Sequence, residues 1–107
     1  MHWYDYAAYF FGGTFLANAI PHLTNGISGR PFPSPFATPP GKGLSSSTVN
    51  VLWGFFNLIV AYMLVFCVGS FTLHNIRHMI AIGAGFLSIS LMLARHFGSL
   101  HGGRLSK

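Results

Sequence analysis

The sequence predicts an all-α integral membrane protein with three transmembrane helices, forming a single membrane domain over residues 1–107. Charged residues make up 7% of the chain, whereas a soluble domain has about a quarter of its residues charged. The few charges also leave three long stretches without any, at residues 6–29, 43–76 and 78–94. Lipid is therefore the predicted solvent for most of this chain.

The first span is predicted at about residues 4–23, the second at about 48–71 and the third at about 75–97. A helix rises about 1.5 Å per residue and needs about 20 residues to cross the hydrocarbon core. The second and third stretches meet this length comfortably. The first is the weakest, because Gly12, Gly13, Thr14 and Asn18 interrupt it, and it is long enough only if it continues past Pro21.

The second and third spans are predicted to form an antiparallel hairpin. Hydroxyl side chains at residues 45–48 can cap the first turn of the second helix, because a serine or threonine oxygen accepts a bond from an unpaired backbone N–H there. Residues 72–75 suffice for a tight turn between the second and third helices.

A long Pro/Gly-rich loop at residues 21–47 separates the first and second spans and holds all six prolines. Phe32 and Phe36 alternate with prolines, which favours a stiff segment whose two rings pack beneath the helices. Residues 39–41, Pro-Pro-Gly, predict a defined turn. The alternative is a plain connector whose prolines only prevent helix formation.

Basic residues predict the orientation. With three crossings, the loop and the C-terminus share one side, and basic side chains concentrate on the cytoplasmic side of multi-pass membrane proteins. We therefore expect a cell (inner) membrane location with the N-terminus outside and the C-terminus cytoplasmic. The other side has Arg77 alone, whereas the loop side has Arg30, Lys42, Arg95, Arg104 and Lys107.

Small and amide residues recur along one face of each span. The second has Asn50, Gly54, Asn57 and Ala61 at helical spacing, and the first has Asn18. Polar side chains within spans normally face other helices or a cavity. Packing of the stripes against each other is the favoured interpretation, and the alternative is a pocket for a small polar solute.

The third span carries the smallest stripe, in which Gly85 and Ser88 follow Ala81 at helical spacing. Small side chains allow helix backbones to approach closely. Gly85 and Ser88 are therefore candidates for helix packing, with Ser88 beside Asn18 and Asn57 as a candidate lining residue in the solute alternative.

Six histidines raise the hypothesis of a bound b-type haem. Such a haem needs two imidazoles from different helices at similar depth, and only His22 and His96 meet this condition. The alternative is histidines that bond to loops and headgroups. We expect no metal site, because His74 and His78, one turn apart, lack a nearby cysteine or carboxylate to complete a zinc shell.

Residues 76–79, Ile-Arg-His-Met, resemble a segment of the cytochrome b-type membrane subunit of succinate dehydrogenase, which is itself a three-span chain. That family ligates haem with a histidine at the position that Phe71 holds here. Its N-terminal Ser/Arg quinone-site motif has no counterpart in this sequence. The resemblance therefore implies neither the haem nor the quinone function of that family.

No catalytic set is visible, because Asp5 is the only acidic residue of the chain. We expect a small accessory or structural subunit of a larger membrane complex that is not an enzyme. Its partners would be the lipid bilayer and other membrane subunits or a second copy, and not nucleic acid, since the basic residues form no stripe. The alternatives are a homo-oligomeric channel or carrier, and a haem-binding electron-transfer subunit.

Overall fold

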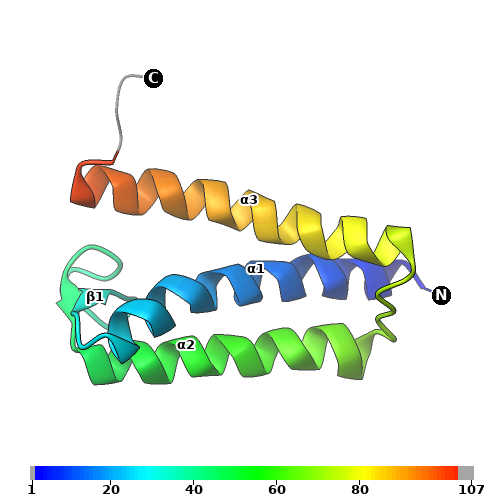
Figure 1. Ribbon diagram of the computed structural model, residues 1–107, viewed down its shortest axis with the longest axis horizontal. Helices are drawn as coiled ribbons and strands as arrows, with labels where there is room; N and C mark the ends of the chain where they lie inside the picture. The colour runs from blue at the N-terminus through cyan, green and yellow to red at the C-terminus, as the bar shows by residue number, and fades with distance from the viewer. Residues whose placement is uncertain (1, 104–107) are drawn as a thin grey trace.

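Three long helical segments lie side by side in the computed structural model, which describes residues 2–103 (Figure 1). A two-stranded antiparallel sheet, in which Phe32 pairs with Ser45, closes one end. The described elements in chain order are α1 (Trp3–Ile27), β1 (Phe32–Pro33), β2 (Leu44–Ser45), α2 (Ser47–Tyr62), the π-helix η1 (Met63–Val68) and α3 (Ile76–His101).

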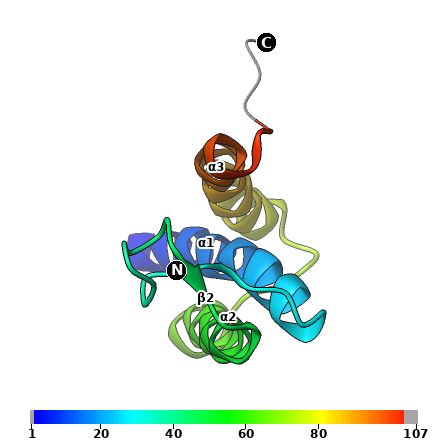
Figure 2. The ribbon, with the colours of Figure 1, turned by 90° about the vertical axis from the view of Figure 1, so that its left-hand side faces the viewer.

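Helix α1 lies between α2 and α3 in both side and end views (Figures 1 and 2). The extensive helix contacts are those of α1 with α2 and of α1 with α3. Helices α2 and α3 follow one another in sequence and run antiparallel, as expected for a hairpin. Their principal packing partner, however, is the helix that precedes both.

Helix α1 continues past Pro21 to Ile27, so the predicted loop start at residue 21 is wrong by seven residues. A proline removes one backbone N–H and interrupts the hydrogen-bond ladder of a helix. Here side chains bond to the neighbouring carbonyls: Thr24 Oγ1 donates to Ile20 O at 2.8 Å, and Asn25 Nδ2 donates to Pro21 O at 2.8 Å. These bonds keep the Thr24 hydroxyl and the Asn25 amide paired within the helix. The donor that Pro21 lacks is the one that would have bonded the carbonyl of Ala17, one turn earlier.

Two described helical segments, Ser47–Val68 and Ile76–His101, are long and apolar enough to cross a membrane. The first ends three residues before its predicted limit, and the second extends four residues beyond it. Helix α1 does not meet this test, and much of its surface is covered by the other two helices. Arg104 and Lys107, two of the basic residues that predict the orientation, lie outside the described residues.

Two adjacent glycines allow α1 to pack closely between the other two helices. Successive residues of a helix point about 100° apart, so Gly12 and Gly13 face different neighbours. A Cβ on Gly12 would collide with Val65 of η1, and a Cβ on Gly13 would collide with the backbone of Ile82 in α3. The Gly-Gly pair therefore allows close approach from two directions at one level of α1.

Gly85 provides the matching close approach from α3. It is buried, and a Cβ there would overlap the backbone carbonyl of Phe10 in α1. Ser88, expected on the same face, is instead exposed, while Ile89 is half-buried. The packed face of α3 continues from Gly85 to i+4 rather than to i+3, so Ser88 is not a packing or lining residue within this chain.

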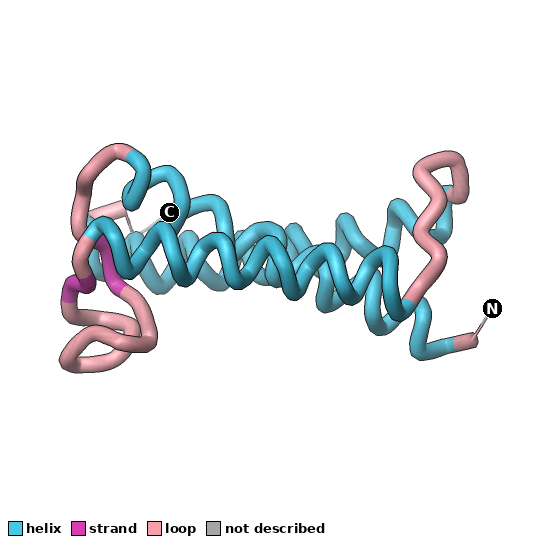
Figure 3. The backbone as a smooth tube through the Cα atoms, turned by 90° about the horizontal axis from the view of Figure 1, so that it is seen from below, coloured by secondary structure: helices cyan, strands magenta, loops and turns pink. Residues whose placement is uncertain are grey.

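The connecting segments gather at the two ends of the helices (Figure 3). At one end Ser46 caps α2 by accepting a bond from Val49 N at 3.2 Å, which confirms the expected hydroxyl cap. At the other end Asn75 Oδ1 accepts from Arg77 N at 2.9 Å and starts α3. Both caps satisfy N–H groups that have no partner within the helix.

The close contact of α1 and α3 predicts that Gly85→Ala destabilises the protein. The added methyl group meets a backbone carbonyl, which cannot move like a side-chain end, and overpacking typically costs about 1–3 kcal/mol. Gly83→Ala is the matched control, because a Cβ there has no described atom within 4 Å and both changes alter helix propensity equally. Thermal unfolding in detergent should show Gly85→Ala clearly below Gly83→Ala; equal stability would contradict this packing.

Candidate functional site

A buried asparagine on α2 connects four segments at the loop end of the bundle. Asn50 Nδ2 faces the backbone oxygens of Phe32 at 3.0 Å, Ser45 at 3.3 Å and Ser46 at 3.0 Å. Asn50 Oδ1 lies 2.7 Å from Nδ1 of His22 on α1. With the side chain of Asn50 fully buried, one amide group joins α1, α2 and both strands.

These contacts determine the tautomer of neutral His22. Three carbonyl oxygens around Nδ2 require that the NH₂ group of Asn50 points at them, because carbonyl oxygens only accept hydrogen bonds. The oxygen of Asn50 therefore faces His22, whose Nδ1 must carry the proton. Nε2 of the neutral ring is left as the acceptor.

His96, the other predicted haem ligand, bonds to the loop. Its Nε2 lies 2.6 Å from Gly41 O and must donate, so Nδ1 is the free acceptor of the neutral ring. His22 and His96 line the same cavity of about 180 Å³. The ring of Phe97 stands against both, with centroids 6.4 Å from His22 and 5.1 Å from His96.

The arrangement does not fit the predicted haem pair. Sites for drug-sized ligands occupy about 300–1,000 Å³, and a haem is at least of that size, so the cavity of about 180 Å³ is too small. Ligation through Nε2 of His96 would also break the bond to Gly41. His22 and His96 lie on different helices at similar depth, as predicted, and they line one cavity. The loop and the ring of Phe97 fill the space between them.

The two predicted asparagines of the spans meet. Asn18 Nδ2 donates to Asn57 Oδ1 at 3.0 Å, and Asn57 Nδ2 donates to Trp53 O at 2.8 Å. Both line a second cavity, of about 240 Å³, with Trp53 and Ile89. The indole N–H of Trp53 is buried and has no hydrogen-bond partner among the described residues. Asn18 and Trp53 also line the cavity of His22, so the two cavities adjoin.

The loop packs beneath the helices through one ring rather than the expected two. Phe32 is buried against His22 and Phe97, with ring centroids 5.5 and 4.6 Å away. Phe36 remains 65% exposed, although its ring meets the edge of Trp53. The expected Pro-Pro-Gly turn is confirmed, since Gly43 N donates to Pro39 O at 2.8 Å across it.

A separate aromatic cluster fills the opposite end. Tyr9 and His78 are buried in contact, with ring centroids 4.7 Å apart. Nδ1 of His78 accepts from Thr72 N at 3.0 Å, so its Nε2 carries the proton of the neutral ring. His74 is exposed and does not join His78 in a site. Among residues 2–103 no group of three metal-binding side chains comes together.

Comparison with protein families, with curated proteins and with solved structures found no match for this chain. What the loop-end cavities can bind must therefore be inferred from the contacts described above. The loop-end cavities present hydrogen-bonding groups and aromatic rings, and Asp5, the one carboxylate of the sequence, caps α1 at the other end by accepting from His2 N at 3.0 Å. The arrangement can hold a folded loop and small polar molecules.

The bonds of Asn50 predict that Asn50→Leu releases the loop. The oxygens of Phe32 and Ser45 would lose their side-chain donor, and each buried unsatisfied group costs about 1–3 kcal/mol. Hydrogen exchange of amides in residues 32–45 should then accelerate by about tenfold or more. Asn57→Leu is the matched control, because Asn57 is equally buried on α2 but does not touch the loop. Equal exchange in both variants would contradict the role of Asn50.

The hydrogen bonds also predict opposite tautomers for two neutral histidines. At a pH where both rings are neutral, nitrogen-15 NMR should show the proton on Nδ1 of His22 and on Nε2 of His96. The first tautomer should change in Asn50→Leu while the second persists. The same tautomer for both rings would contradict the placement of the loop.

Proposed function

We propose that this chain is a non-enzymatic accessory or structural subunit of a larger membrane complex, and that α1 crosses the bilayer together with α2 and α3. Helix α1 has 25 residues and so spans about 37 Å. It packs on both apolar helices (Figure 1). Two of its polar side chains are directed inward, because Asn18 and His22 bond to α2.

The charge distribution supports a cytoplasmic loop end. Arg30 and Lys42 lie in the loop and Arg95 in the last turns of α3, while Arg77 begins α3 at the other end. Asp5 caps α1 at that same end. Arg30, Lys42 and Arg95 thus lie at the loop end and Arg77 alone at the other end. By the positive-inside rule, the more basic loop end is expected to face the cytoplasm.

An aromatic hollow on the outer face of α2 carries the proposal of a protein partner. Trp53 and Phe56 stack with centroids 5.6 Å apart, and Phe36 of the loop meets Trp53 edge-on at 5.3 Å. With Val49 and Leu52 they line an open concavity of about 560 Å³. Aromatic residues around a concave centre are typical of protein interfaces, and a neighbouring transmembrane helix would fill this one.

A carrier for a small polar solute is the second candidate function. It is favoured by the two adjoining cavities and by the unpartnered indole N–H of Trp53. Against it, Asn18 Nδ2 is already bonded to Asn57 Oδ1 and Asn57 Nδ2 to Trp53 O, and Ser88 is exposed on the outside of the bundle. Flux of small solutes into liposomes that contain the purified protein distinguishes this function from a structural one.

The hollow predicts that Phe56→Ala detaches the chain from its complex. Phe55→Ala is the matched control, because Phe55 is the adjacent ring, is similarly exposed (57% against 51%) and lies outside the hollow. After extraction in mild detergent, size analysis and mass spectrometry should find a defined partner with the wild type and Phe55→Ala but not with Phe56→Ala. A lone chain in the wild type would overturn the proposal.

A further inference from the structure

A groove opens between α1 and α3 at the loop end of the bundle. The two helices are in close contact where Gly13 and Gly85 lie, and they diverge from there toward the loop (Figure 1). The diverging half encloses a volume of about 500 Å³. Residues from Ala17 to Asn25 of α1 and from Phe86 to Phe97 of α3 line it.

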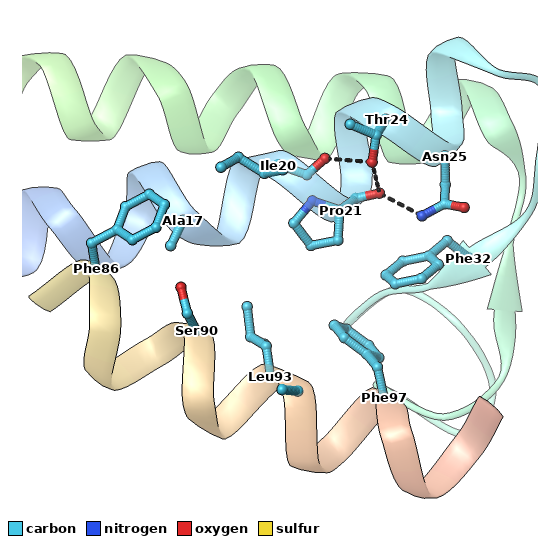
Figure 4. A pocket seen from close by; sticks show the side chains of 11 residues that line it. Ala17, Ile20, Pro21, Thr24, Asn25, Phe32, Phe86, Ser90, Leu93 and Phe97 are labelled. Carbon is cyan, nitrogen blue, oxygen red and sulfur yellow. Dashed lines mark hydrogen bonds between the residues drawn. The ribbon is translucent and has the colours of Figure 1, made fainter. Parts of the chain in front are cut away.

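The walls of the groove are apolar although α1 has polar residues there. The ring of Pro21 points toward α3, where Leu93 and Phe97 face it (Figure 4). Thr24 Oγ1 and Asn25 Nδ2 turn to carbonyls of their own helix (Figure 4), and Asn25 Oδ1 accepts from Arg30. An occupant therefore meets carbon atoms along most of the groove.

The length of the groove matches one leaflet of a bilayer. The lining residues of α3, from Phe86 to Phe97, cover about 16 Å along the axis, and those of α1 about 12 Å. Half of a hydrocarbon core is about 15 Å. A partner helix would run along the whole bundle. This groove, by contrast, ends at the contact of Gly85 with Phe10, about halfway along the bundle.

Arg30 places a positive charge at the loop end of the groove. Arg30 is exposed and is tied to the groove by Asn25, whose Oδ1 accepts from Nε at 3.2 Å and whose O accepts from Arg30 N at 2.8 Å. The remaining guanidinium N–H groups can bind an anion. His101 stacks on Phe97 and lies 5.7 Å from the Phe32 ring, on the α3 side of the same mouth.

No acidic side chain of the described residues competes for this arginine, because Asp5, the only acidic residue of the sequence, lies at the far end of α1. From the leaflet length, the apolar walls and this charge, we propose that the groove binds an anionic phospholipid. One acyl chain lies between α1 and α3, and the phosphate lies at Arg30 with His101 beside it. The inference rests on the proposal that α1 crosses the bilayer with α3, but not on the accessory-subunit role, since the aromatic hollow is lined by α2 and the loop.

Native mass spectrometry of the full chain in detergent tests the site, with phosphatidylglycerol and phosphatidylcholine of identical acyl chains as probes. One basic residue near an anionic lipid favours it by about fivefold. We expect about fivefold more retained phosphatidylglycerol than phosphatidylcholine, and no adduct with glycerol 3-phosphate, which has the same phosphate but no chain.

Two pairs of variants separate headgroup from chain. Arg30→Gln should abolish the preference, whereas Lys42→Gln, which removes an equal charge from the same loop, should keep it. Ala94→Phe fills the groove and should reduce retention of both lipids several-fold, whereas Leu91→Phe, outside the groove on an exposed position, should not.

Arg30, Ala94 and Leu91 are all exposed, so these variants should fold normally. Equal retention of the two lipids by the wild type would overturn the proposal. So would equal effects of Arg30→Gln and Lys42→Gln, or a dimer of the chain that Ala94→Phe disrupts while lipid retention is unchanged.

Discussion

The amide of Asn50 is the contact on which the loop end of the protein depends. In apolar surroundings a backbone carbonyl without a donor is costly, and the loop brings the carbonyls of Phe32 and Ser45 beneath the helices. Asn50 Nδ2 donates to these carbonyls, and Asn50 Oδ1 accepts from His22 at the same time. The loop, α1 and α2 are therefore one unit, to which α3 adds the bond of His96 to Gly41.

Close packing of backbones organises the rest. Gly12 and Gly13 admit neighbours from two sides of α1, and Gly85 brings α3 against Phe10. This contact holds α1 and α3 together in one half of the bundle only. In the other half, polar bonds and close approaches at Gly26 and Gly54 hold α1 to α2, while α3 stands apart and leaves the groove at Pro21. The glycine contact of α3 with α1 in one half only thus produces both a tight crossing and a hydrophobic cleft.

The sequence predicted three membrane-spanning helices, and the three helices are present, two of them long and apolar enough to span a membrane. It also predicted the cap at Ser46 and the close approach at Gly85, because these follow from local composition and spacing. It misplaced the end of α1, because a proline in the sequence favours the end of a helix, whereas α1 continues through Pro21 to Ile27. Ser88 was misplaced because i+3 and i+4 positions differ in direction by about 100°. The role of Asn50 could not be predicted, because its partners are backbone oxygens of a folded loop, although its place in the amide stripe was a signal.

The central position of α1 determines the order in which the chain is put together. Helix α1 precedes both of its packing partners in the chain, and it is not one of the two helices that are apolar enough to cross a membrane by themselves. During synthesis its asparagine and histidine stay without partners until α2 and the loop emerge. Because the extensive contacts of α2 and of α3 are with α1 rather than with each other, we expect α3 to dock last, against the glycines of α1. A chain cut before α3 would then keep the polar contacts of α1 with α2 but expose Gly13, which faces α3 in the complete bundle.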